Sequence, residues 1–184
     1  MGKTYDRIDD KLEAFISEQH LFFVATAPLA GDGLVNVSPK GLDSFRVLGP
    51  RTVGYLDLTG SGVETIAHLK ENGRIVLMFC AFEGYPKILR FQGQGEVLEP
   101  GHPDYDSVKT AFPDHPGSRA IIRVHTHRIS DACGFGVPLM SYQGERSQLV
   151  AAAESKGPEG LDEYRRRKNA TSLDGLPGLD FPDP

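Results

Sequence analysis

The stretch that organises the chain is Leu58-Thr59-Gly60-Ser61-Gly62-Val63-Glu64, where a strand pattern gives way to a helix pattern. It follows the strand-like run 52–57 and opens a helical run that stops at Asn72-Gly73. Ser61 and Glu64 have the spacing of a capping box, and the glycines beside Ser61 let backbone approach a ligand closely. A helix N-terminus presents unpaired N–H groups and partial positive charge. The turn is therefore a candidate phosphate site, and a capped turn without any ligand is the alternative.

Composition limits both the architecture and the partners. With 184 residues, 39% of them hydrophobic, we expect one domain over 1–184 with its core at about 10–130. A formal charge of −5 argues against nucleic acid as a partner. No apolar run approaches the ~20 residues that span a bilayer, and the polar run 1–10 does not resemble a signal peptide. Because Cys80 and Cys133 stand far apart, we expect a reduced, cytoplasmic protein without a disulfide framework.

The rest of the pattern consists of short strands separated by turns that are rich in Gly and Pro. Strands are predicted at 21–27, 34–38, 44–48, 52–57, 74–82, 87–98 and 119–130. Helices are predicted at 6–20, 62–72, 102–112, 146–156 and 158–168. Antiparallel spacing with only short helices between strands predicts a mainly β fold, a six-stranded antiparallel barrel with flanking helices and a helical C-terminal arm.

Four blocks of residues, in this order, resemble the pyridoxamine 5'-phosphate oxidase-like, FMN-binding split barrels. The blocks are 35–41, 53–62, 66–75 and 88–95. The resemblance implies a split β-barrel that forms a homodimer with FMN at the subunit interface. It also implies an oxidoreductase that acts on a small molecule.

In that family the flavin ring lies along the strand that holds the Ser-Pro-Lys-type block, and the phosphate lies near the strand-to-helix turn. The resemblance implies that the ring and ribityl chain contact Val37, Ser38, Pro39, Lys40 and Gly41, with Leu56 and Asp57 continuing the wall. It implies phosphate contacts from Thr59, Ser61 and Gly62, with positive charge from Lys40, Lys87 or Arg90.

The sequence departs from true pyridoxamine phosphate oxidases in two places. Those enzymes carry an Arg-Lys pair at the start of the helix, where this chain has Ser61 and Gly62. They also have a C-terminal block that contains Trp, and this chain has no Trp. We therefore do not expect that particular activity. One alternative is an enzyme of the same fold that uses a deazaflavin, whose acidic tail could bind the basic run 165–168. The other is a non-catalytic module that binds flavin or haem.

Two further features have simpler explanations than chemistry. His125 and His127 share one strand face at a spacing usable for metal, but a surface or interface strand explains them, and we predict no metal site. Cys133 lies in a loop of small residues and is interpreted as a packing residue of a lid over the pocket, with a nucleophilic thiol as the alternative. No catalytic residue is assigned from the sequence.

Overall fold

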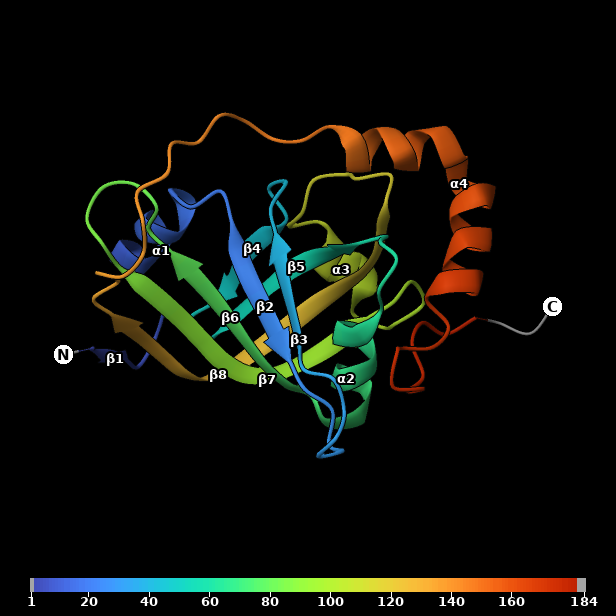
Figure 1. Ribbon diagram of the computed structural model, residues 1–184, viewed down its shortest axis with the longest axis horizontal. Helices are drawn as coiled ribbons and strands as arrows, with labels where there is room; N and C mark the ends of the chain where they lie inside the picture. Colours follow the sequence, from blue (N-terminus) through green and yellow to red (C-terminus); the bar gives the residue numbers. More distant parts are fainter. Residues whose placement is uncertain (1, 182–184) are drawn as a thin grey trace.

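The computed structural model describes residues 2–181, and its centre is one curved antiparallel sheet (Figure 1). The strands follow the order β3 (Asn36–Lys40), β2 (Phe22–Thr26), β6 (Arg74–Cys80), β7 (Ile88–Leu98), β8 (Ser118–Ala132), β5 (Thr52–Leu58) and β4 (Phe45–Gly49). An eighth strand, β1 (Thr4–Tyr5), pairs with β8. The architecture confirms the predicted split barrel with flanking helices. Within residues 2–181 the sheet has eight strands where a six-stranded barrel was predicted: seven correspond to the seven predicted runs, and β1, with two residues, is too short to show any periodicity.

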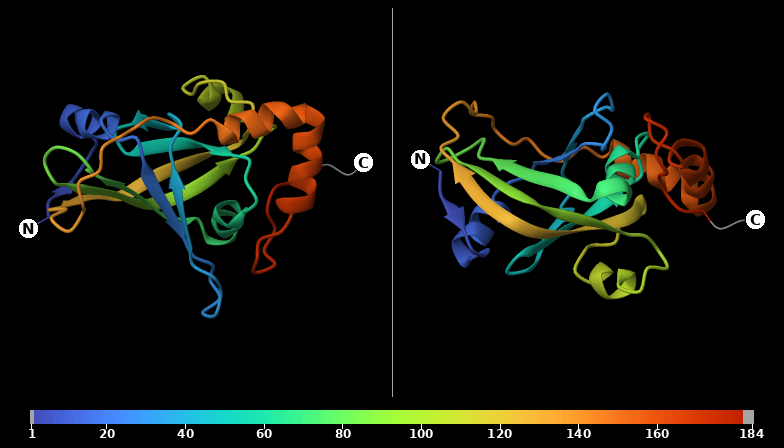
Figure 2. Two further views of the ribbon diagram at one scale, coloured as in Figure 1. Left: turned by 45° about the horizontal axis from the view of Figure 1, so that its top comes forward. Right: turned by 90° about the horizontal axis from the view of Figure 1, so that it is seen from below.

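The two longest strands, β7 and β8, give the sheet its curvature. Their register shifts between Gln92 and Gly93, and an added Cβ at Gly93 would lie 2.3 Å from the His125 carbonyl oxygen. This close approach is available only to glycine, and the bulge bends the pair. Figure 2 shows the resulting curl of the sheet around its interior.

Four helices accompany the sheet within the described residues: α1 (Asp10–Ser17), α2 (Glu64–Asn72), α3 (Tyr105–Lys109) and α4 (Gln148–Lys168). Asp9 caps α1 by accepting a hydrogen bond from the Leu12 amide. In α4 the backbone is non-helical at Gly157, with φ of 63°, just before Pro158. The two helices predicted there are therefore separate pieces that meet at a kink. Among residues 2–181, no helix is both long and apolar enough to cross a bilayer.

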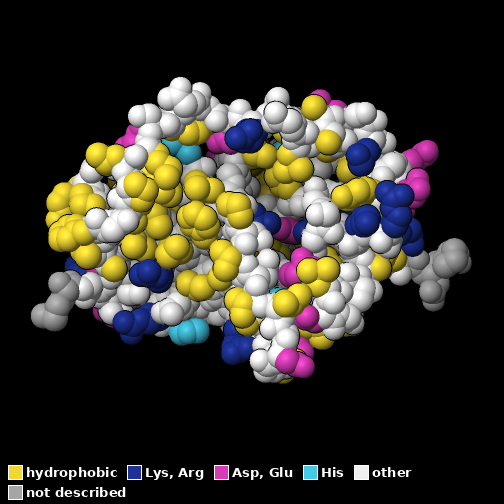
Figure 3. Space-filling model, viewed as in Figure 1, with side chains coloured by type: hydrophobic (Ala, Val, Ile, Leu, Met, Phe, Trp, Pro, Cys, Tyr) yellow, Lys and Arg dark blue, Asp and Glu magenta, His cyan; other side chains and the backbone are white. Residues whose placement is uncertain are grey.

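Alternation along the strands divides the sheet into an inner and an outer face. The register row Val24, Leu77, Phe91 and Ile129 points inward and is completely buried. Next to it, the row Pro39, Phe23, Met78 and Arg90 points outward. Figure 3 shows that hydrophobic side chains cover much of one face of the molecule.

Candidate functional site

A charged cleft lies between the edge strand β3 and the turn Leu58–Val63 that leads from β5 into α2. It is a cavity of about 240 Å³. Residues of β3, of the turn, of α2 and of β8 line it, namely Asn36, Ser38, Pro39, Lys40, Leu58, Gly60, Gly62, Glu64, Thr65 and Arg119. Near the middle of the face in Figure 3, a hollow contains side chains of both charges beside the hydrophobic area.

The wall of the charged cleft is a buried group of three ionised side chains. Asp57 is completely buried on β5. The Lys40 Nζ lies 3.0 Å from one oxygen of its carboxylate, and the Arg119 Nε lies 2.7 Å from the other. Burial alone would raise the pKa of Asp57, but Lys40 and Arg119 together lower it to about 2. One carboxylate therefore faces two cations, and the group carries a net positive charge.

Arg119 has bonding capacity that the protein leaves unused. Its side chain is 5% exposed, and within the described chain its Nη1 atom is buried without a hydrogen-bond partner. A buried charged donor that lacks an acceptor is costly. The arrangement therefore suits a bound anion with several acceptor oxygens.

The turn itself differs from the predicted capping box. Helix α2 begins at Glu64, and its N-cap residue, Val63, makes no side-chain capping hydrogen bond in the described chain. Ser61 lies two residues before the N-cap position, so it does not cap the helix. The Thr59 amide and hydroxyl both donate to the Gly117 carbonyl oxygen, at 2.7 and 2.8 Å. The Glu64 carboxylate instead folds back towards Gly62 and lines the charged cleft.

Some of the predicted cofactor residues come together as expected. Ser38, Pro39, Lys40 and Gly62 line the charged cleft, and Asp57 fixes Lys40 from below. Thr59 and Ser61 lie on the other side of the turn, where a hollow of about 280 Å³ separates it from α4. Their predicted contact with the same cavity is not supported, because the turn presents opposite sides to the two hollows.

Three other predicted residues point elsewhere. Val37 alternates with Ser38 along β3, so it faces outward and is 62% exposed. Leu56 packs in a small core cluster with Leu98 and Ile121. Gly41 lies beyond the end of β3 and lines a different pocket, beneath α1. Strand alternation and the end of the strand explain these departures.

Lys87 and Arg90 do not line the charged cleft of this chain, so their predicted contribution of charge to the cofactor stays a prediction. Strands β2 and β6 separate β7 from β3 in the sheet. Lys87 lies with its ammonium 4.8 Å from the centre of the Phe15 ring. Arg90 faces outward opposite Met78.

Arg119, Asn36 and Thr65 are site residues that the sequence analysis missed. The Asn36 amide donates to the Thr65 hydroxyl at 2.9 Å and to the Thr26 hydroxyl at 3.2 Å, so it joins β3 to α2 across the cleft. The available signal was Asp57, because a carboxylate inside an apolar strand needs buried cations. Which cations those are depends on the β5–β8 pairing, which the sequence does not reveal.

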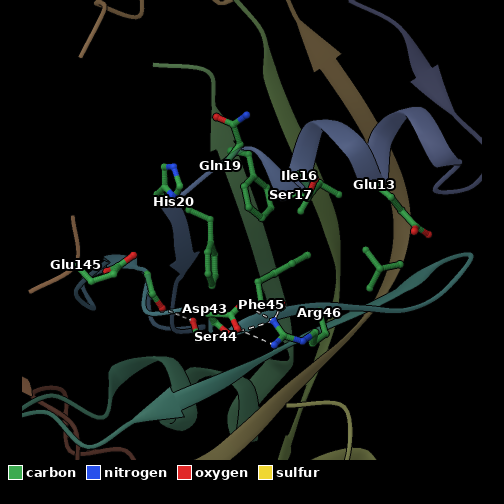
Figure 4. A pocket seen from close by; sticks show the side chains of 14 residues that line it. Glu13, Ile16, Ser17, Gln19, His20, Asp43, Ser44, Phe45, Arg46 and Glu145 are labelled. Atoms are coloured by element: carbon green, nitrogen blue, oxygen red, sulfur yellow. Dashed lines mark hydrogen bonds and ion pairs between the residues drawn. The ribbon is translucent and has the colours of Figure 1, made fainter. Parts of the chain in front are cut away.

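A second pocket lies beneath α1 and has a volume of about 440 Å³ (Figure 4). Phe22, Phe45 and Phe79 form its aromatic floor. Arg46 at its rim is held by both carboxylate oxygens of Asp43, at 2.8 and 2.9 Å, and also donates to backbone carbonyls. The charge of Arg46 is therefore already balanced by Asp43, and the backbone carbonyls accept further hydrogen bonds from it.

The remaining candidates do not form a site. Cys133 is exposed, and the His125 Nδ1 lies 3.5 Å from the Thr52 hydroxyl. Within 2–181, no three His, Cys, Asp or Glu side chains are grouped so that they could hold a metal ion.

Comparison with known proteins agrees with this architecture. The family model described as "Pyridoxamine 5'-phosphate oxidase" matches residues 8–133. A pyridoxamine 5'-phosphate oxidase family protein of Aspergillus flavus is 41% identical over 192 residues, which cover 95% of this chain and 77% of that protein.

Solved structures share the fold at lower identity. The HupZ protein of Group A Streptococcus, in its H111A form, matches with a TM-score of 0.52 at 23% identity, over 68% of this chain and 99% of that one. A putative pyridoxamine 5'-phosphate oxidase of Lactobacillus delbrueckii matches with a TM-score of 0.50 at 20% identity, over 69% and 98%.

The curved sheet defines a split-barrel protein with a charged cleft at its edge. With the family match over more than half of its length, the chain belongs to the pyridoxamine 5'-phosphate oxidase family.

Proposed function

We propose that this protein binds FMN in the charged cleft and acts as a flavin-dependent oxidoreductase on a small molecule in the cytoplasm. The observation that carries the proposal is the buried Nη1 of Arg119, which has no partner within residues 2–181, beside a cleft lined by the two cations Lys40 and Arg119. The phosphate of FMN would offer acceptor oxygens to the Arg119 guanidinium, which lines the cleft. Membership of the family supports a flavin as the ligand.

The residues of the cleft fit a phosphate monoester. Arg119 and Lys40 supply positive charge, and the start of α2 supplies backbone N–H groups that have no intrahelical acceptor. Ser38 lines the same cavity, and its hydroxyl donates to the Asn36 side-chain oxygen at 3.2 Å. Glu64 is the one carboxylate of the lining, and it opposes an anion.

Bound FMN would supply the redox chemistry, because its ring accepts or donates a hydride. The chain contributes position and charge. Asp57 holds Lys40 in place, so that the ammonium is fixed rather than mobile at the edge of β3. The Asn36–Thr65 hydrogen bond ties β3 to α2 and sets the width of the cleft. No residue of the chain is assigned as a general acid or base.

We further propose that the protein is a homodimer formed through the outer face of β3, β2 and β6. Val37 is 62% exposed there, and Val35 in the preceding hairpin is 71% exposed. An apolar area of this kind on a monomer is unusual and favours a partner surface. Because Arg90 belongs to the outward rows of this face, it could contact only the cofactor of the partner subunit. A monomeric mass in light scattering would contradict the dimer.

The alternatives have weaker support. A deazaflavin tail would need a basic groove, but Arg166 pairs with Asp162 and, within the run 165–168, only Arg165 reaches the turn in the described structure. Haem would need an axial ligand, and the described lining of the charged cleft includes no histidine or cysteine. FMN is therefore the best-supported ligand.

The test is the visible spectrum of the purified protein, followed by titration of the colourless form with FMN, deazaflavin and haem. We expect FMN to bind, and Lys40→Ala to weaken it by roughly 10- to 100-fold through loss of one charge-assisted contact. Lys11→Ala, an exposed lysine of α1, is the matched control and should bind as the wild type does. Binding of none of the three ligands would overturn the proposal.

A further inference from the structure

The C-terminal arm, residues 148–181, contacts the turn of the charged cleft from behind. Helix α4 belongs to this arm and packs at one end of the sheet (Figure 1). The Arg165 Nε donates to the Thr59 hydroxyl at 2.8 Å, and its Nη2 donates to the Ser118 carbonyl oxygen at 2.9 Å. Asn169, just beyond α4, is completely buried and donates to the Gly60 carbonyl oxygen at 3.0 Å. Two residues of the arm therefore fix the backbone that borders the anion site.

Arg165 also adds a third cation to the same region. It is half-buried, and its pKa is lowered first by that burial and then by the nearby charge of Arg119. Arg165 thus lies near Arg119, which together with Lys40 holds the buried carboxylate of Asp57. Asp162 compensates Arg165 in part but also pairs with Arg166. An anion bound at the turn would relieve the repulsion between the two guanidinium groups.

Arg165 and Asn169 lie outside the part of the chain that matches the family model. The part of the chain that matches the family model ends at residue 133, before the arm begins. Within the matched part, the start of α2 offers Ser61 and Gly62, neither of which carries charge. Positive charge at the turn is therefore supplied by Arg165 of the arm and not by the residues at the start of α2.

We infer that the arm completes the phosphate site, with Arg165 and Asn169 as positioning residues and Arg165 as an added source of positive charge. This inference rests on the proposed function, since it concerns the same phosphate. Asn169 holds the Gly60 peptide in place. Arg165 holds Thr59 in place. Its charge also favours a flavin that carries a phosphate over a flavin that lacks it.

The experiment compares FMN with riboflavin, which lacks the phosphate, on the wild type and on Arg165→Gln, Arg165→Lys and Arg166→Gln. Arg165→Gln should weaken FMN about tenfold or more and leave riboflavin unchanged. Arg165→Lys should recover part of the loss, because lysine restores the charge but not the two-armed hydrogen bonding. Arg166→Gln, at an exposed neighbour, should behave as the wild type. If Arg165→Gln leaves the ratio of FMN to riboflavin affinity unchanged, whether because neither affinity changes or because both fall equally, the inference is overturned.

Inorganic phosphate provides a readout that does not depend on a flavin. Phosphate that binds the folded chain raises its melting temperature, and Arg165→Gln should reduce that rise while Arg166→Gln should not. If the wild type binds no flavin but shows the phosphate effect and loses it in Arg165→Gln, the proposed function fails and the arm inference stands. If phosphate stabilises the wild type and Arg165→Gln equally, or neither of them, the arm inference fails.

Discussion

The charged cleft and the pocket beneath α1 each contain an arginine, and the two arginines differ in whether the protein satisfies all their hydrogen-bond donors. Arg46, at the rim of the pocket beneath α1, is held by Asp43 and by backbone carbonyls, and that pocket is the larger of the two at about 440 Å³. Arg119, in the cleft of about 240 Å³, keeps one buried nitrogen without a partner in the described chain. Our proposal that the charged cleft is the ligand site therefore rests on unmet bonding capacity rather than on size.

The largest expected effect concerns the carboxylates that hold these two arginines. Asp57→Asn removes the one buried partner of two cations and should cost about 3–5 kcal/mol of unfolding free energy. Asp43→Asn breaks an ion pair whose carboxylate is 75% exposed and should cost less than about 1 kcal/mol. Urea denaturation of both variants measures the difference, and equal losses would contradict the contrast between the two regions.

The second prediction removes the arginines themselves. Arg119→Gln should weaken FMN by roughly 10- to 100-fold, since a charge-assisted hydrogen bond is worth about 1.5–3 kcal/mol. Arg46→Gln should leave FMN affinity within about twofold of the wild type, because the charges at its rim are already matched. Fluorescence titration of both variants checks this. A larger loss in Arg46→Gln would move the cofactor site to the pocket beneath α1.

Acid should destabilise the protein through Asp57 in particular. Its pKa is about 2 in the folded chain against an ordinary value of 3.8, so its stabilising contribution is complete above about pH 4 and is lost as pH falls towards 2. This difference corresponds to about 2 kcal/mol. Asp57→Asn should therefore flatten the stability curve between pH 4 and pH 2. A curve as steep as that of the wild type would show that other carboxylates dominate.

The smallest expected effect comes from Glu64, the carboxylate that lines the charged cleft. Glu64→Gln removes a like charge near the proposed phosphate and should strengthen FMN binding by about two- to fivefold, the scale of one charge near a helix terminus. Glu163→Gln, on the exposed surface of α4, serves as the control. Weaker FMN binding in Glu64→Gln would mean that the carboxylate contacts the ligand favourably.

The sequence predicted the elements well because their periodicity is local. The strand at 74–82 and the kink before Pro158 both appear where expected. The site was predicted only in part, since Ser38, Lys40 and Gly62 lie in the charged cleft but Lys87 and Arg90 do not. Arg119 could not be found from local pattern, because its role follows from the β5–β8 pairing. Arg165 reaches Thr59 across 106 positions of the chain, a contact that no sequence motif encodes.

The central claim, that the charged cleft is a phosphate site for FMN, is tested most directly by measuring FMN and riboflavin binding to the wild-type protein side by side. The two ligands share the ring system and differ in the phosphate. If Arg119 and Lys40 bind that phosphate, FMN should bind about 100-fold more tightly, which corresponds to about 2.7 kcal/mol. Equal affinities for FMN and riboflavin would contradict the claim.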